Sequence, residues 1–288
     1  MQLIVPRTSP TTCCVLGFWL VAGSFLLHES LAFQGLDYLL VNERVIEERL
    51  RSYSNDNVLR METLKVLFEA VGCSGSLLEK QPVDGADVPN VICTLPGETD
   101  SVILVGAHFD FLDAGSGVAD NWSGTSLLPS LYESLQDRER QHTYVFVGFT
   151  DEEKGLLGSD YYVQHLGASE VEDLRAMINL DTLGLSSTKV WESHAEPFLV
   201  KALYRVAEST NLPLETMNVD KMGTSDSESF ARWDIPRITL HSVTKRNFSI
   251  LHSSRDTMDV IQLEEYYNSY RLLAAYLAAL DTFLGSLH

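Results

Sequence analysis

Three consecutive carboxylates, Asp151, Glu152 and Glu153, follow a run of β-branched and aromatic residues at 142–149, with only Thr150 between them. The run predicts a strand that is buried on both faces. Adjacent carboxylates repel one another, so the arrangement costs stability unless something positive offsets it. In open α/β sheets, ligands bind at the carboxyl ends of parallel strands, which is where this stretch would lie. The plainer alternative is the first turn of a helix, where acidic side chains favour the helix dipole.

Histidine and carboxylate residues also follow other predicted strands. His108, Asp110 and Asp181 stand at strand ends, Asp120 precedes a predicted helix, and His252 lies after the last strand. If the strands are parallel, these ends converge on one rim of the sheet. Imidazole and carboxylate ligands without sulfur are typical of zinc, and also of manganese or iron. Taken singly, each residue could instead be a structural histidine, a helix cap or a turn former.

The number of these side chains favours a pair of metal ions. One catalytic zinc takes three protein ligands. Two histidines and three carboxylates exceed that need and fit two ions that share one carboxylate, about 3.5–4 Å apart. Asp110 lies two positions after His108 on an extended chain, so both side chains point the same way. We therefore expect Asp110 to hold the second ring nitrogen of His108 and to fix its tautomer.

The strands and helices that must position these residues alternate along the chain. Strands are predicted at 90–95, 101–108, 142–149, 176–181 and 236–242. Helices are predicted at 37–53, 56–72, 123–136, 156–166, 196–210, 226–232 and 262–284. Pro129 should kink the third of these helices or mark a late start. The alternation predicts an α/β fold: one three-layer domain with a mixed, mostly parallel central sheet and helices on both faces.

Composition narrows the classes of partner. The chain has 288 residues, is 45% hydrophobic and carries a formal net charge of −19. The length suits one large α/β domain or two small ones. The negative charge argues against a nucleic-acid partner, because a phosphate backbone would be repelled. It is compatible with metal ions and cationic ligands.

The first residues differ from the rest. A signal peptide is predicted at 1–32, with the main domain at 33–288. The prediction depends on Arg7, the apolar run at 13–27 and the small residues before position 33. We expect a secreted or periplasmic protein without stable membrane association once the signal is removed. An uncleaved anchor is the alternative, although a spanning helix needs about 20 apolar residues. In an oxidising compartment Cys73 and Cys93 would form a disulfide. The alternative is that both remain buried free thiols.

The series GAHFD, DNWSG, FTDEEKGLLGS, INLDTLG and LHSSRDTMD resembles the exported zinc aminopeptidases with a co-catalytic metal pair, relatives of bacterial leucyl aminopeptidases, aminopeptidase Y and glutaminyl cyclases. The resemblance covers residues 88–280, with the motifs in the same order. It implies that His108 and Asp181 bind one zinc ion and that Glu153 and His252 bind the other. Asp120 would bridge the two.

The same resemblance implies that Glu152 is the general base. It would take a proton from a water activated by the two zinc ions and pass it to the leaving amine. The implied protein is an exopeptidase that releases N-terminal amino acids from peptides with a free N-terminus, and we expect it to be a monomer. The alternatives are a glutaminyl cyclase-like acyltransferase with one zinc and a non-catalytic binding module that keeps the fold.

Three further expectations come from the resemblance. Asn121 stands where many family members have aspartate, and we expect little effect because this side chain is not a ligand. The segment 225–230 resembles the family's SDH-x-x-F stretch with Ser227 in place of histidine, and we expect it to line the substrate pocket. In the family the peptide bond after the bridging aspartate is often cis, so we expect a cis bond between Asp120 and Asn121.

Overall fold

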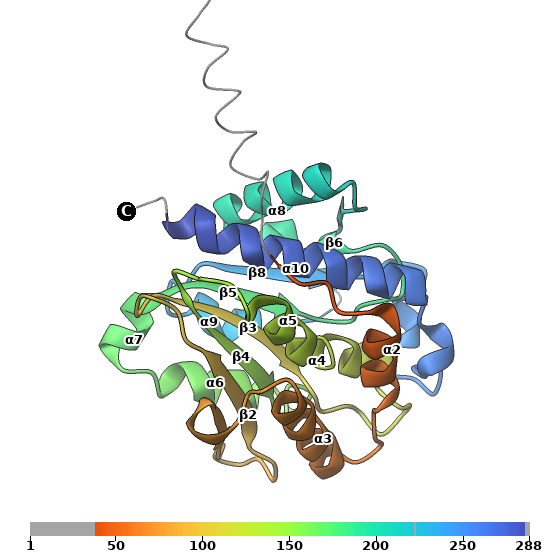
Figure 1. Cartoon of the computed structure of the whole chain (residues 1–288). Helices are drawn as coiled ribbons and strands as arrows, with labels where there is room; N and C mark the ends of the chain where they lie inside the picture. The colour runs from red at the N-terminus through yellow and green to blue at the C-terminus, as the bar shows by residue number, and fades with distance from the viewer. Residues whose placement is uncertain (1–37, 222, 286–288) are drawn as a thin grey trace, which may run out of the picture. The chain divides into compact units, whose positions relative to one another are not determined.

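One central sheet of eight strands runs through the described residues, 38–221 and 223–285, of the computed structural model (Figure 1). Its strand order is β1-β2-β4-β3-β5-β8-β6-β7. The expected signal peptide at 1–32 lies outside the described residues. The strands are β1 (Leu78–Gln81), β2 (Asn90–Leu95), β3 (Val102–His108), β4 (Thr143–Phe149), β5 (Leu174–Leu180), β6 (Lys189–Val190), β7 (Glu215–Thr216) and β8 (Arg237–His241).

The middle of the sheet is parallel. Strands β4, β3, β5 and β8 are neighbours that pair in parallel, whereas β1, β2 and β6 join through antiparallel pairs. His108 pairs with Phe149, so β3 and β4 end level with one another. The expected α/β fold with a mixed, mostly parallel sheet is therefore confirmed, and the carboxyl ends of the parallel strands share one rim.

Helices cover both faces of the sheet (Figure 1). On one face Phe146 of β4 contacts Tyr132 of α5, with ring centroids 6.0 Å apart. On the other, Phe149 of β4 contacts Phe230 of α9 at 6.2 Å. Residues three apart on a strand point to opposite faces, so these contacts belong to different layers. The helices are α2 (Glu43–Arg51), α3 (Asn57–Ala70), α4 (Ser123–Thr125), α5 (Leu128–Leu135), α6 (Leu157–Gln164), α7 (Ala168–Asp173), α8 (Pro197–Thr210), α9 (Ser227–Ala231) and α10 (Leu263–Gly285).

Pro129 divides the helix predicted at 123–136. The short α4 ends at Thr125, and α5 starts at Leu128 with Pro129 in its first turn. Proline is tolerated there because the first amides of a helix have no partner within the helix. The late start expected from this proline is thus confirmed.

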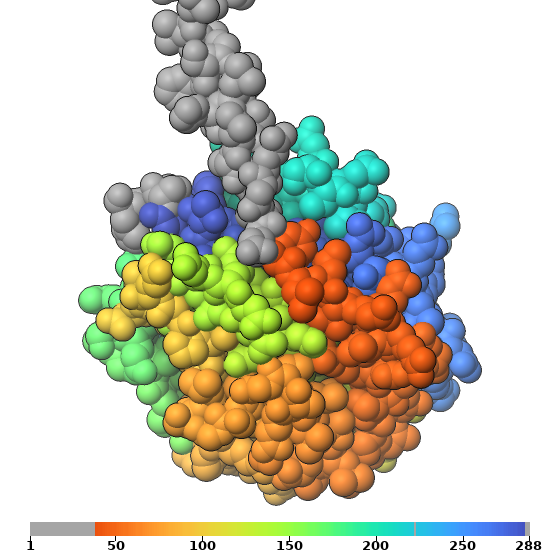
Figure 2. Space-filling model, viewed as in Figure 1, coloured from red at the N-terminus to blue at the C-terminus, as the bar shows by residue number. Residues whose placement is uncertain are grey.

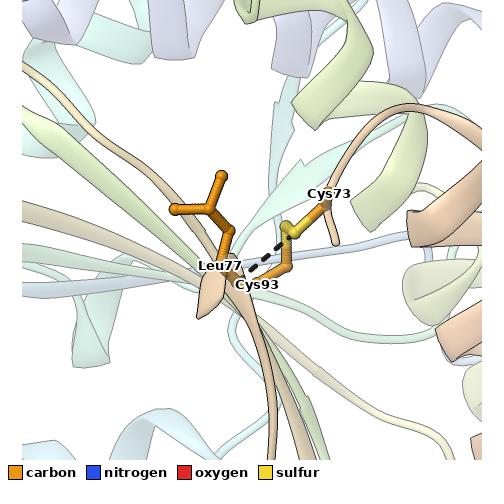
Figure 3. Close-up of a disulfide and its surroundings, with 3 residues drawn as sticks. All are labelled: Cys73, Leu77 and Cys93. Carbon is orange, nitrogen blue, oxygen red and sulfur yellow. Dashed lines mark hydrogen bonds between the residues drawn. A yellow bond between two sulfur atoms is a disulfide. The ribbon is translucent and has the colours of Figure 1, made fainter. Parts of the chain in front are cut away.

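A disulfide joins Cys73, just after α3, to Cys93 in β2 (Figure 3). Both cysteines are fully buried. The bond ties the outer helix layer to the antiparallel side of the sheet, and it decides between the two alternatives for these residues. None of the helices in the described part of the chain is long and apolar enough to cross a membrane.

Candidate metal centre

The rim of the sheet brings together the five residues expected to be ligands. His108 ends β3, Asp181 follows β5, and Glu153 lies in the loop after β4. Asp120 comes from the segment between β3 and α4, and His252 from the loop after β8. Their ligand atoms form two groups, within each of which all atoms lie within 4.8 Å of one another. The groups are His108, Asp120 and Asp181, and Asp120, Glu153 and His252.

Asp120 belongs to both groups and faces each with a different oxygen. Its Oδ1 lies 3.3 Å from His108 Nε2, and its Oδ2 lies 3.1 Å from His252 Nε2. Glu153 Oε2 also lies 3.1 Å from His252 Nε2. This is the arrangement that a carboxylate bridging two cations requires. The other Glu153 oxygen, Oε1, is buried without a hydrogen-bond partner and so is left with an unused lone-pair site.

Charge is concentrated in these groups. Burial would raise the pKa of Asp120, but its hydrogen bonds with His108 and His252 outweigh burial and hold the pKa below its usual value. Hydrogen bonds with Asp120 and Glu153 raise the pKa of His252 to about 10. Each histidine thus sits among carboxylates that stabilise a positive charge at its position. A nitrogen and oxygen donor set of this kind fits zinc without any sulfur ligand.

Asp110 has a wider role than holding a histidine. Its Oδ1 lies 3.3 Å from His108 Nδ1, which is the expected neighbour. In addition, Oδ1 accepts a hydrogen bond from Glu152 N at 3.0 Å, and Oδ2 accepts one from Glu153 N at 3.1 Å. One buried carboxylate therefore sets the positions of both glutamates relative to His108.

The three consecutive carboxylates lie in a loop and not in a helix. Helix α6 begins only at Leu157, so the alternative of a helix first turn is wrong. Asp151 adopts the left-handed backbone conformation, with φ of 51°. Burial raises the pKa of Glu152 well above its usual value. Nearby His108 lowers this pKa, whereas the negative charges of Asp226 and Asp181 raise it further. Among the described residues, Glu152 belongs to neither ligand group and faces the adjacent cavity.

Two further residues support the candidate ligands through contacts that the sequence does not predict. Asp256 is buried and accepts hydrogen bonds from Ala119 N at 2.7 Å and Asp120 N at 3.0 Å. Ser225 donates to Asp181 Oδ2 at 2.7 Å. Both contacts span long stretches of sequence, so no local pattern reveals them. The motif LHSSRDTMD does contain Asp256, and its position there was the one available signal.

Asn121 holds the rim through its side-chain amide. Its Oδ1 accepts hydrogen bonds from Gly124 N and Thr182 N, both at 3.0 Å, and its Nδ2 donates to Leu180 O at 2.8 Å. It thereby ties the end of β5 to the segment that carries Asp120. The peptide bond between Asp120 and Asn121 is cis, as expected.

A cavity of about 270 Å³ opens next to the ligand groups. In its part away from them, apolar side chains lie beside two polar side chains that already have partners. His241 Nε2 lies 2.8 Å from Met217 O and its Nδ1 accepts from Val243 N, while Thr239 donates to Ser227. Burial also lowers the pKa of His241 to about 4, so the ring is neutral. The remaining apolar lining includes Trp191, Val219, Phe248 and Leu251.

The segment 225–230 does not line this cavity, so that expectation is wrong. Ser227 is fully buried, and its hydroxyl accepts a hydrogen bond from Thr239 at 2.8 Å. It therefore lies behind the cavity wall, whereas Gly223 and Thr224 form the wall itself.

Comparison with known protein families gives a match over most of the chain. The model of "Peptidase family M28" matches residues 90–277. Leucine aminopeptidase 2 of Trichophyton rubrum is 38% identical over 96 residues, which make up 33% of this chain and 19% of the relative. The chain thus matches about a fifth of the length of this curated relative.

Solved structures share the fold. The LapA aminopeptidase of Legionella pneumophila has a TM-score of 0.75 at 21% identity, covering 88% of this chain and 75% of LapA. BSAP, a zinc aminopeptidase from Bacillus subtilis, has a TM-score of 0.60 at 23% identity, and the match covers 66% of this chain and 49% of BSAP. The glutaminyl cyclase of Fimbriiglobus ruber has a TM-score of 0.64 at 16% identity, and the match covers 82% of this chain and 93% of the cyclase. At these sequence identities, the similarity shows a shared fold only.

Proposed function

The chain belongs to peptidase family M28, and from this premise we propose that it is a metal-dependent exopeptidase that releases N-terminal amino acids from peptides. The observation that carries the proposal is the position of Asp120 between two groups of ligand residues, with one carboxylate oxygen toward each histidine. This favours two metal ions, each with three protein ligands. The donor set and the unpaired Glu153 Oε1 fit zinc.

Zinc at these positions would lower the pKa of a bound water toward neutrality and polarise the scissile carbonyl. The chain itself then has to move protons. Glu152 lines the cavity beside the candidate ligands, and burial raises the pKa of its carboxyl group. A carboxylate in this position can act as a general base. Its carboxylate would accept the proton of the attacking water and deliver it to the leaving amine nitrogen. Asp110 holds the Glu152 backbone in place for both steps.

The cavity suggests how a peptide would be oriented. The carboxylates on the rim would attract the free α-ammonium group of a peptide. The first side chain would then enter the apolar part of the cavity, lined by Trp191, Val219 and Phe248. A charged side chain would lose its hydration there without gaining a partner. We therefore expect N-terminal leucine to be preferred to N-terminal arginine.

The assay compares leucyl, arginyl and glutaminyl amides incubated with the zinc-loaded protein. The expected result is free leucine, released at least tenfold faster than arginine. The alternative, a glutaminyl cyclase, is favoured by the fold shared with the Fimbriiglobus ruber enzyme and would give a pyroglutamyl product. The absence of any product with zinc bound would support a non-catalytic binding module and sink the proposal.

Export is part of the proposal. We infer that residues 1–32 are removed as a signal peptide and that the mature protein is secreted or periplasmic and monomeric. Sequencing the N-terminus of protein recovered from outside the cytoplasm should give a chain that begins near position 33. A chain that begins near Met1 and sediments with membranes would support the anchor instead.

A further inference from the structure

Arg60 is a buried arginine on α3, outside the region 90–277 that the family model matches. Its side chain is fully buried, although arginine is almost never buried without partners. Removing a guanidinium group from water is costly unless its donors are satisfied. The outer side of α3 forms part of the surface shown in Figure 2, whereas Arg60 points into the molecule.

The partners of Arg60 are backbone carbonyl oxygens. Nε donates to Ser54 O at 2.6 Å, next to its own helix. Nη1 donates to Phe109 O at 2.9 Å and Nη2 donates to Gly117 O at 3.1 Å. Nη2 also donates to Ser116 O. Three of the four carbonyls thus belong to one loop, residues 109–117, which is far from Arg60 in the sequence.

This loop joins two of the candidate metal ligands. Phe109 directly follows His108, and Gly117 precedes Asp120 by three residues. Arg60 therefore holds both ends of the loop, next to the backbone of each of these two candidate ligands. The loop closes tightly over the guanidinium group, because the ring of Phe111 lies 4.3 Å from Arg60 Cζ. Gly117 has a left-handed φ of 49°, and a Cβ there would lie 2.3 Å from Phe111 Cβ.

Asp256 supports the same segment as Arg60. Its carboxylate holds the amides of Ala119 and Asp120, and its carbonyl oxygen accepts from Ser116 N at 2.8 Å. The backbone leading to Asp120 is thus held by both a buried cation and a buried anion. Because opposite charges attract, the two supports also stabilise each other.

We propose that Arg60 is a positioning residue of the metal centre, which fixes loop 109–117 so that His108 and Asp120 are placed for metal binding. The inference rests on the proposed function, because it needs the five residues to be ligands. Arg60 touches neither the cavity nor the ligand side chains, so it acts through the backbone. Lysine cannot replace it, since a single ammonium lacks the planar fork that reaches several carbonyls at once.

The test measures zinc affinity in the full chain by competition with a chromophoric chelator. We compare the wild type with Arg60→Lys and Arg60→Met. Loss of an outer partner of a metal ligand typically weakens binding about 10- to 100-fold, and we expect this range for both variants. Activity should return as zinc is added, with KM within about twofold of the wild type, because the substrate cavity is unchanged.

Arg140 supplies the matched control. It also donates to backbone carbonyls, those of Pro96, Leu135 and Gln136, but it lies before β4, at the end of the sheet opposite the metal centre. Arg140→Met should lower the thermal unfolding midpoint without changing zinc affinity. This separates a loss of general stability from a loss at the metal centre.

Each outcome decides the inference. Wild-type zinc affinity in folded Arg60→Met would overturn it, and if that variant does not fold, wild-type affinity in Arg60→Lys would do so. A wild type that binds zinc but hydrolyses no aminoacyl amide would sink the proposed function, and the affinities of the variants would still decide the role of Arg60. A wild type that binds no zinc would overturn both.

Discussion

At the scale of single residues, two adjacent glutamates differ in their surroundings. Both line the cavity, but Glu153 contacts His252 and lies in a candidate ligand group, whereas Glu152 belongs to neither group of the described residues. We predict that Glu152→Gln abolishes turnover and leaves the zinc content unchanged, because the variant cannot accept a proton. Glu153→Ala should instead lose about half of the bound zinc, since one of two sites loses a ligand. Metal analysis beside a turnover assay checks both, and the opposite pattern would reverse the two roles.

The residues with chemistry could be recognised from the sequence because they follow strands. His108, Asp181 and the acidic loop stand at strand ends, where the topology of the sheet gathers them. Arg60 and Asp256 could not be recognised in this way. Their contacts beside the candidate ligands are with backbone atoms 49 or more positions away, and no residue pattern encodes such a contact. The same holds for Ser227, whose place behind the cavity wall depends on Thr239.

At the scale of elements, the strongly patterned segments match the structure, whereas the two-residue strands could not be predicted. The strand predicted at 90–95 coincides with β2, and the helix predicted at 196–210 differs from α8 by one residue. Strands β6 and β7 have two residues each, which is too short for a period of two to be detected. The strand order also could not be predicted, because it depends on pairing between distant segments.

The disulfide gives a prediction about the attachment of α3. It closes a loop with a sequence separation of 20 between Cys73 and Cys93. Its removal should lower the free energy of unfolding by about 3 kcal/mol, because the unfolded chain gains freedom. Denaturant titrations with and without reductant measure this difference. The double variant Cys73→Ala, Cys93→Ala is the control and should not respond to reductant, and a wild type that is equally unresponsive would contradict the prediction.

Helix α10 is joined to the start of β4 through a buried carboxylate. Asp281 accepts hydrogen bonds from His142 N at 2.9 Å and Gln141 N at 3.1 Å. Burial would raise the pKa of Asp281, but these bonds and the His142 side chain outweigh it and hold the pKa below its usual value. We predict that Asp281→Asn lowers the free energy of unfolding by about 2 kcal/mol at pH 7.

The pH dependence of this effect has a definite sign. A carboxyl group with a lowered pKa in the folded state stabilises the fold above its ordinary pKa, near 3.9, and loses this effect as the pH falls further. The difference between the wild type and Asp281→Asn should therefore be constant from about pH 5 to 8 and shrink below about pH 4. Urea titrations across this range measure it, with Asp137→Asn at an exposed position as control. A difference that grows toward low pH would contradict the assignment.

At the scale of the whole molecule, acidic charge and metal binding are linked. The chain carries a formal net charge of −19, and several of its carboxylates are buried together at one rim. Like charges in a low-dielectric interior repel one another, so an unmetallated rim opposes folding. The metal ions proposed here would offset this repulsion in the folded chain only, since the unfolded chain does not assemble the ligands. Stability and metal occupancy should then change together.

Removal of metal should accordingly lower the thermal unfolding midpoint. At free zinc 1,000 times its dissociation constant, binding contributes about 4 kcal/mol to the folded state. For a domain of this size each kcal/mol shifts the midpoint by about 2–4 °C, so a chelator should lower it by about 8–16 °C. Calorimetry with zinc and with excess chelator measures the shift. Asp120→Ala, which removes the residue common to both ligand groups, should unfold at the same temperature under either condition. A wild type whose midpoint ignores the chelator would show that these carboxylates are held together without a metal ion.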